Sequence, residues 1–167
     1  MLRGKTAVFV DWANVYGWTK SLKTEVDPVR LHKYLKSYDL ISAIHLYAGE
    51  DTHHKSKEFL REVAQIGYRV VSKPVKYITV EVDGKKAYRR KCDFDMEVCI
   101  DAHFFLQGDF ESFVFFSGDG DFEPLYKLLI GKGKQVIVIY TAGHLGREIW
   151  NIERGLFKAQ IKNLMDI

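Results

Sequence analysis

Carboxylates gather in three separate segments of the 167-residue chain, at positions that a single fold can bring together. Mg²⁺ and Mn²⁺ prefer carboxylate oxygens and water as ligands. Beside a phosphodiester, such an ion activates water and stabilises the leaving oxygen. The residue types therefore predict a divalent metal site that serves phosphodiester hydrolysis. The candidate residues are Asp11, then Asp93, Asp95, Glu97 and Asp101, and finally Asp119 and Asp121.

The acids of the middle segment are not equivalent if that segment is helical. At about 100° per residue, Glu97 and Asp101 share a helix face, whereas Asp95 points roughly 120–160° away from them. All of them can serve one metal only if Asp95 lies at the start of the helix. We therefore predict Asp95 as the ligand and keep Asp101 as the second choice, the alternative for Asp101 being a solvated or supporting carboxylate.

The last segment, SGDGDF at 117–122, would by itself also fit a turn followed by a capped helix. A calcium-binding EF-hand loop is excluded, because the sixth position counted from Asp119 is Pro124 where that loop needs glycine. Gly118 and Gly120 are expected to let the backbone turn sharply, so that Asp119 and Asp121 approach one site.

Apolar strand-like runs alternate with helix-like stretches, and this order must position the acids. Such alternation predicts right-handed βαβ units and a mainly parallel sheet, whose ligands bind beyond the carboxyl ends of the strands where the strand order reverses. Asp11 and the 117–122 segment each follow a predicted strand. Strands are predicted at 6–10, 43–48, 68–72, 112–117 and 135–140, helices at 28–38, 52–66, 93–106 and 123–130, and a helix or last strand at 156–167.

Residues 75–91 interrupt the alternation and read as a hairpin around Asp83-Gly84. Eight basic and two acidic residues give +6 over 69–91, whereas the other 17 basic and 20 acidic residues give −3. A two-residue turn pairs Val82 with Lys85 and Tyr77 with Arg90, so that one face packs on the body and the other meets phosphates and bases. The alternative is a solvated hairpin whose edge lysines prevent aggregation. The predicted substrate-binding residues are Lys76, Tyr77, Lys86, Tyr88, Arg90 and Lys91.

Three ordered motifs, VFVDWANVY at 8–16, KCDFDME at 91–97 with Asp101-Ala102, and FSGDGDF at 116–122, resemble those of NYN domains, in particular the LabA-like branch. NYN domains are relatives of PIN-domain nucleases. The resemblance covers roughly residues 5–142. It implies a PIN-like Rossmannoid α/β fold, a three-layer sandwich around a mainly parallel five- to six-stranded sheet, with the hairpin inserted. It also implies metal-dependent cleavage of RNA that leaves a 5′-phosphate and a 3′-hydroxyl.

The resemblance also assigns roles to individual residues. Asn14 and Ser117 support the site, Ser117 by orienting Asp119. The sequence departs from the family pattern at Cys92, where glycine is usual, at the additional Asp93, and at Trp12-Ala13, which replaces a small or polar pair. The implied metal ligands are Asp11, Asp95, Asp119 and Asp121.

The sequence thus predicts a single domain over 1–167 that hydrolyses RNA, with DNA as a second possible substrate, and that uses Mg²⁺ or Mn²⁺. A non-catalytic RNA-binding or regulatory module of the same fold remains open, as does the oligomeric state, with a homodimer as one alternative. A phosphatase with Asp11 as nucleophile is disfavoured, because the second-next residue is Ala13 and not an acid. The longest apolar run, Val136–Tyr140, is too short for a membrane span, and no signal peptide is recognised, so we expect a cytoplasmic protein.

Overall fold

The computed structural model describes residues 1–82 and 85–164. The predicted Asp83-Gly84 turn and the end of the 156–167 segment lie outside the described residues. Six parallel strands form the central sheet in the order β3-β2-β1-β6-β7-β8. The strands are β1 (Thr6–Asp11), β2 (Ile41–Glu50), β3 (Arg69–Pro74), β6 (Ser112–Phe116), β7 (Gln135–Tyr140) and β8 (Leu156–Gln160).

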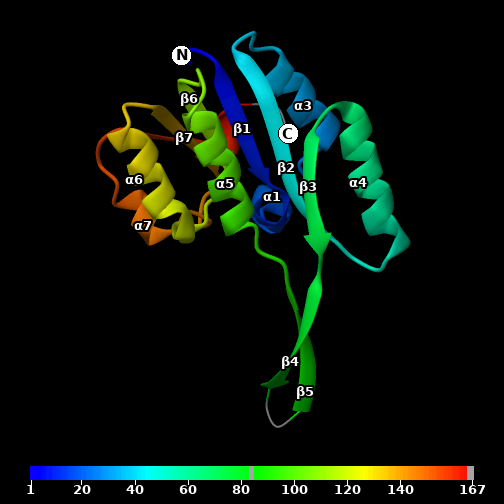
Figure 1. Cartoon of the computed structure of the whole chain (residues 1–167). Helices are drawn as coiled ribbons and strands as arrows, with labels where there is room; N and C mark the ends of the chain where they lie inside the picture. Colours follow the sequence, from blue (N-terminus) through cyan, green and yellow to red (C-terminus); the bar gives the residue numbers. More distant parts are fainter. Residues whose placement is uncertain (83–84, 165–167) are drawn as a thin grey trace.

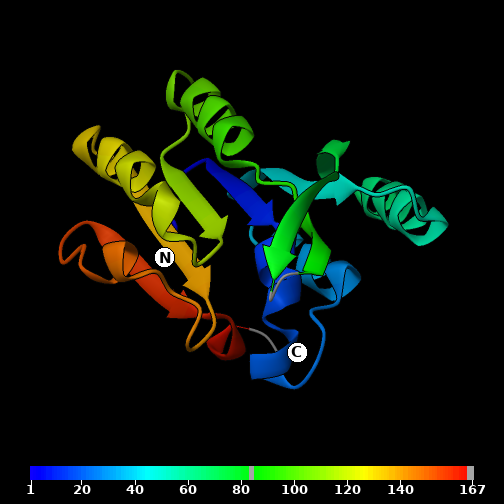
Figure 2. The ribbon, with the colours of Figure 1, turned by 90° about the horizontal axis from the view of Figure 1, so that it is seen from below.

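Helices cover both faces of this sheet, as Figures 1 and 2 show. On one face lie α3 (Pro28–Lys36) and α4 (His54–Ile66), and on the other α5 (Asp95–Leu106) and α6 (Glu123–Gly131). The strands β1 and β6 are apolar along almost their whole length because they are buried on both faces, as parallel strands usually are. The predicted mixed α/β fold with a parallel sheet is therefore confirmed.

Most predicted helices and strands occur within a few residues of their expected bounds. Asp27 caps α3 by accepting a hydrogen bond from the Val29 amide at 2.8 Å, and α4 ends at Gly67 in the left-handed region. The region 156–160 is a strand, which settles the alternative left open for it. Five short elements have no counterpart among the predicted ones: α1 (Trp12–Gly17), α2 (Thr19–Leu22), η1 (Gly120–Phe122), α7 (Arg147–Trp150) and η2 (Ile161–Asn163).

The hairpin consists of β4 (Lys76–Val82) and β5 (Lys85–Lys91), which pair with each other and not with the central sheet. The predicted register is confirmed, since Tyr77 pairs with Arg90 and Val82 with Lys85. We expect the apolar face of the hairpin, which carries Ile78, Val80 and Ala87, to pack on the body. This is wrong, since Ile78 is 43% exposed. The reason is visible in Figure 1, where the hairpin continues β3 beyond the carboxyl edge of the sheet and projects away from both helical layers.

None of the helices in the described ranges 1–82 and 85–164 is both long enough and apolar enough to cross a membrane.

Candidate functional site

The candidate site lies between β1 and β6, where the strand order reverses. The chain leaves β1 toward β2 and β3, and leaves β6 toward β7 and β8, so the carboxyl ends of β1 and β6 face the same opening. Asp11 is the last residue of β1, and Asp119 follows β6 by three positions. Asp95 is the first residue of α5. It therefore lies at the start of the helix, which is the condition for predicting it as the ligand in place of Asp101.

Hydrogen bonds tie the two strand ends together. The Ser117 hydroxyl donates to Asp11 Oδ2 at 3.3 Å and accepts from the Asp119 amide at 3.3 Å. Asn14 Oδ1 accepts from the Gly118 amide at 3.1 Å and from Trp18 Nε1 at 2.9 Å. Ser117 and Asn14 thus connect the first and last acidic segments.

Both segments also use their aspartates as caps. Asp11 accepts from the Asn14 amide at 3.2 Å and begins α1, and Asp119 accepts from the Asp121 amide at 3.1 Å and begins η1. Capping alone would be a structural explanation for each residue. It does not explain why both carboxylates converge with Asp95 on one opening.

The carboxylates are close enough to repel one another. Burial and, to a smaller extent, the charges of Asp119 and Asp95 raise the pKa of Asp11 to about 6. Burial likewise raises the pKa of Asp95, with further contributions from Asp119, Asp93 and Asp121. A bound cation would relieve this repulsion, because it stabilises the charged form of every carboxylate around it.

Beneath the cluster lies Tyr126, which is fully buried. Burial and the charges of Asp11 and Asp119 raise its pKa well above the ordinary value. Within the described residues its hydroxyl has no hydrogen-bond partner. A polar hydroxyl left unpaired under two carboxylates is an unusual arrangement, since buried polar atoms are normally satisfied.

The donor set suits a hard divalent cation, because it consists of carboxylate oxygens. Over residues 1–82 and 85–164, however, no three histidine, cysteine or acidic side chains are already arranged to hold a metal ion. Binding would therefore have to draw the carboxylates closer together. The residues fit the ion by chemistry and by mutual charge, and the side chains would have to adjust to coordinate it.

The remaining acids of the middle segment have other partners. Glu97 pairs with Lys73 at 2.6 Å, and Asp93 with Lys91 at 3.7 Å. Asp101 Oδ2 accepts from the Tyr47 hydroxyl at 2.8 Å and lies 3.0 Å from His45 Nδ1. These contacts give Asp101 a role in joining α5 to β2.

The loop after β7 forms another wall of the site. The Gly146 amide donates to the Gly118 carbonyl at 2.7 Å, and a Cβ at position 118 would lie 1.5 Å from the His144 carbonyl oxygen. Gly118 is therefore required by close backbone packing. The expected sharp turn is a weaker explanation, because neither Gly118 nor Gly120 has a positive φ. His144 itself bonds to Ser21 through its ring, at 2.8 Å.

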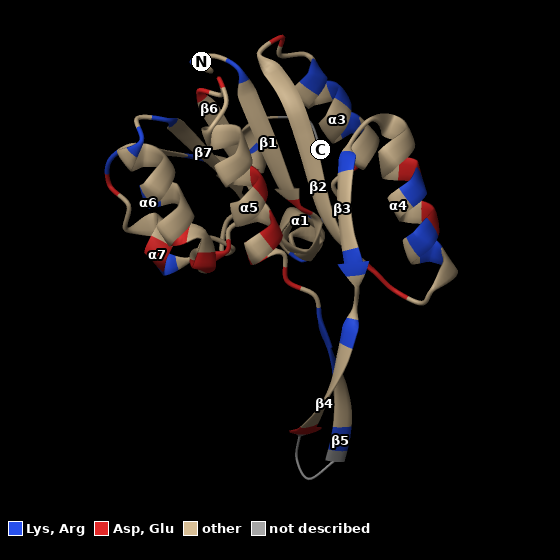
Figure 3. Ribbon diagram, viewed as in Figure 1, with Lys and Arg blue, Asp and Glu red and all other residues tan. Residues whose placement is uncertain are grey.

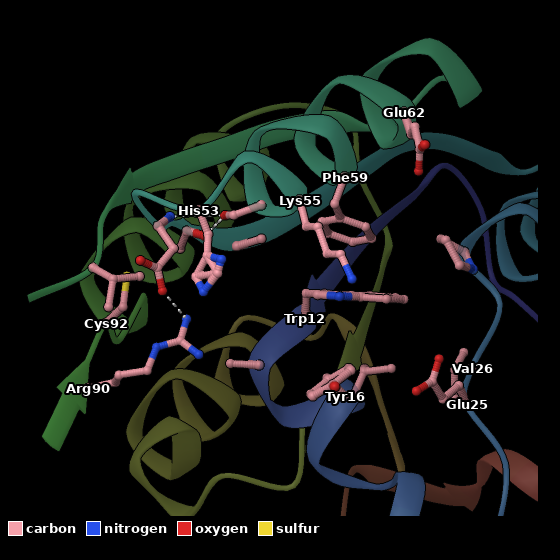
Figure 4. A pocket seen from close by; sticks show the side chains of 18 residues that line it. Trp12, Tyr16, Glu25, Val26, His53, Lys55, Phe59, Glu62, Arg90 and Cys92 are labelled. Carbon is pink, nitrogen blue, oxygen red and sulfur yellow. Dashed lines mark hydrogen bonds and ion pairs between the residues drawn. The ribbon is translucent and has the colours of Figure 1, made fainter.

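An open pocket of about 840 Å³ is lined by residues of α1, directly after Asp11, and by residues of the end of β2 and of α4. Its aromatic walls are Trp12, Tyr16 and Phe59, and Figure 4 shows them grouped together. In the sequence, Trp12 stands out only as a departure from the family pattern. The spacing of Trp12 and Tyr16, four residues apart directly after Asp11, was the available signal.

The predicted substrate-binding residues fall into two groups. Arg90 pairs with the buried Asp51 at 2.9 Å, and the Tyr77 hydroxyl donates to the same carboxylate at 2.8 Å, so these two fix the base of the hairpin. The others lie exposed along the hairpin, whose basic character is visible in Figure 3. They are Lys76, Lys86, Tyr88 and Lys91.

The six-stranded parallel sheet, the separate hairpin and the acidic opening between β1 and β6 together are consistent with a PIN-like fold. The NYN domain family matches residues 5–152, and the chain belongs to this family. It is 29% identical over 149 residues to the low amplitude and bright protein LabA of Synechococcus elongatus, covering 88% of this chain and 79% of that protein. Its fold also resembles the crystal structure of a protein of unknown function from Vibrio parahaemolyticus, with a TM-score of 0.67 and 23% sequence identity. The match covers 93% of this chain and 92% of that chain.

Proposed function

We propose that this NYN-domain protein is a metal-dependent ribonuclease that hydrolyses RNA phosphodiester bonds. Families of this PIN-like kind are generally nuclease-like, which supports the coarse assignment. The more specific assignment, metal-dependent hydrolysis of RNA, rests on the crowding of Asp11, Asp95 and Asp119. Their mutual repulsion contributes to the raised pKa of Asp11. Carboxylates held together in this way favour a cation, and the adjacent basic hairpin favours a polyanionic substrate.

Asp11, Asp95, Asp119 and Asp121 would hold Mg²⁺ or Mn²⁺, which when bound supplies an activated water and stabilises the leaving oxygen. Ser117 and Asn14 keep the ends of β1 and β6 in place through the hydrogen bonds described above. The exposed cations of the hairpin bind phosphates on either side of the cleaved bond. The expected products carry a 5′-phosphate and a 3′-hydroxyl.

The test is a cleavage assay on mixed single-stranded and structured RNA, with DNA in parallel, in Mg²⁺, Mn²⁺ or EDTA. Asp11→Asn and Asp119→Asn should each abolish cleavage while the fold survives. Asp109→Asn is a matched control, because Asp109 is exposed at the opposite edge of the sheet and pairs there with Lys5 at 2.7 Å. Cleavage that persists in EDTA, or in both site variants, would overturn the proposal.

A second candidate is an RNA-binding module without catalysis. It is favoured by the exposed cations of the hairpin, which suit a polyanion whether or not a metal is bound. Such a module would bind RNA with a strong salt dependence and show no turnover with any metal. We place either activity in the cytoplasm, in keeping with the free thiols of Cys92 and Cys99.

A further inference from the structure

The pocket beside the carboxylate centre is directly connected to it through the chain. Asp11 caps α1, and Trp12 and Tyr16 are the first and fifth residues of that helix. Residues four apart lie on one side of a helix, so both rings face the pocket. A group bound between them is therefore held by the helix that begins directly after Asp11, the residue on which the proposed chemistry depends.

The two faces of the Trp12 ring have different surroundings. Phe59 of α4 stacks on one face, with ring centroids 5.0 Å apart and an angle of 28° between the planes. Figure 4 shows Tyr16 on the opposite side of Trp12 from Phe59. Among the described aromatic residues, Trp12 and Tyr16 make no ring pair, and Tyr16 is 62% exposed. The space between Trp12 and Tyr16 is therefore an aromatic slot with one wall already held rigid by Phe59.

Charge is distributed unevenly around this slot. In Figure 4, Arg90 and His53 lie at one end, Lys55 reaches in beside Trp12, and Glu25 and Glu62 lie at the other end. Arg90 is already paired with Asp51, so Lys55 is the lining cation that suits a phosphate. Glu25 and Glu62 offer acceptors for the ring and exocyclic N–H groups of a base.

We propose that this pocket binds one unpaired nucleobase of single-stranded RNA, stacked between Trp12 and Tyr16, at the nucleotide next to the phosphate that approaches Asp11. The volume of about 840 Å³ is ample for one nucleotide. Stacking on aromatic side chains is the usual way in which proteins capture unpaired bases. This inference rests on the proposed function only in that the ligand is RNA; the binding itself needs no metal.

The experiment measures binding in EDTA, so that cleavage plays no part. Single-stranded RNAs of 12 nucleotides, each with one abasic position moved along the strand, are titrated against wild type, Trp12→Ala and Tyr16→Ala. For the wild type, one abasic position should weaken binding about tenfold, the size expected for loss of one stacked base. Trp12→Ala should bind intact RNA about tenfold more weakly and lose its sensitivity to that position. Tyr16→Ala should likewise become insensitive to that abasic position, with a smaller loss of affinity for intact RNA.

Trp150→Ala is the matched control, because Trp150 is 62% exposed, lies outside the pocket lining and has its ring near Lys158. Tyr16→Ala guards against misfolding, since Tyr16 is mostly exposed whereas Trp12 packs on Phe59. The proposal is overturned if no abasic position matters to the wild type, if Trp12→Ala keeps the wild-type sensitivity, or if a nucleoside monophosphate displaces RNA at equal concentration. Absence of cleavage in Mg²⁺ with the abasic pattern intact would overturn only the proposed ribonuclease activity.

Discussion

The carboxylate centre and the hairpin lie at the same edge of the sheet, yet they hold their charges in opposite ways. In the centre, like charges are crowded and partly buried, and Asp11 is fixed by hydrogen bonds from the Ser117 hydroxyl and the Asn14 amide. On the hairpin, like charges are spread along two exposed strands that pair only with each other. The hairpin is connected to the body mainly at its base, through Tyr77 and Arg90 on Asp51.

This difference has an energetic consequence. Crowded carboxylates destabilise the folded protein unless a cation compensates them, so their arrangement makes sense as a binding site whose ligand restores stability. Solvated lysines cost little, because water and salt screen them. Substitutions in the centre should therefore change chemistry and stability together, whereas substitutions of the exposed hairpin lysines should change RNA affinity alone.

The largest effects are expected in the carboxylate centre. Asp95→Asn removes a carboxylate that faces Asp11 and Asp119, and should slow cleavage by about 100-fold or more, because several kcal/mol of transition-state stabilisation depend on the metal. Asp101→Asn should leave the rate per folded molecule close to wild type, since Asp101 bonds to Tyr47 and His45. Single-turnover cleavage with saturating enzyme measures both. Equal losses in the two variants would contradict the assignment of Asp95 as the ligand.

A smaller effect is expected from the hairpin. Replacing the exposed Lys76, Lys86 and Lys91 by glutamine should weaken RNA binding by about tenfold or more near 0.1 M salt. It should also reduce the slope of log K against log salt by about 2, at roughly 0.7 per lost phosphate contact on a single strand. Filter binding at several salt concentrations checks this. The cleavage rate at saturating RNA should not change, and a loss of that rate would mean that the hairpin takes part in catalysis.

The main outlines of the fold were predictable because its long elements carry strong periodic signals. The buried strands β1, β6 and β7 are nearly continuous apolar runs, and α3 and α4 have polar caps or a terminal glycine. The short helices α1, α2 and α7 were not predicted, because four to six residues are too few to show a period. The direction of the hairpin depends on where β3 ends relative to the body, which no local pattern encodes.

The candidate site was predictable where residues follow strand ends and not where they depend on contacts across the fold. Asp11 and Asp119 could be paired because both follow central strands. The Asp51 contacts could not be foreseen, since Asp51 lies in a loop and meets Tyr77 and Arg90 only through the path of the hairpin. For the same reason, the part of Gly118 in packing against the loop at His144 becomes visible only in three dimensions.

The raised pKa of Asp11 predicts that Asp11→Asn gains stability in a pH-dependent way. The pKa of Asp11 is raised to about 6, so ionising it destabilises the folded state fully above that pH, less between about 6 and 4, and hardly below. The variant should therefore unfold with a free energy about 1–3 kcal/mol higher at pH 7.5, and the gain should vanish near pH 4. Urea unfolding at both pH values measures this, with Asp109→Asn as control.

Mg²⁺ offers an independent check on the same variant. A cation that binds only the folded protein stabilises it by RT ln(1 + L/Kd), where L is the free cation concentration, so the melting temperature rises with that concentration. Wild type should therefore melt at a higher temperature when Mg²⁺ is added, and Asp11→Asn should respond less. An equal response in both proteins would place the cation elsewhere.

The smallest effect is expected at the base of the hairpin, from Tyr77→Phe. The Tyr77 hydroxyl is the main reason why the pKa of Asp51 is lowered, followed by the Thr52 amide and the charge of Arg90. Removing the hydroxyl should loosen the hairpin, so that amides of β4 and β5 exchange severalfold faster while those of β1 and β6 keep their protection. Tyr88→Phe, at a side chain that is 76% exposed, should change neither.

A carboxylate with a lowered pKa stabilises the fold at neutral pH and loses that contribution as pH falls through the folded-state pKa. The difference in protection of the β4 and β5 amides between Tyr77→Phe and wild type should therefore shrink in acid. Tyr88→Phe serves as the control at each pH. A difference independent of pH would mean that Tyr77 holds the hairpin by packing and not through Asp51.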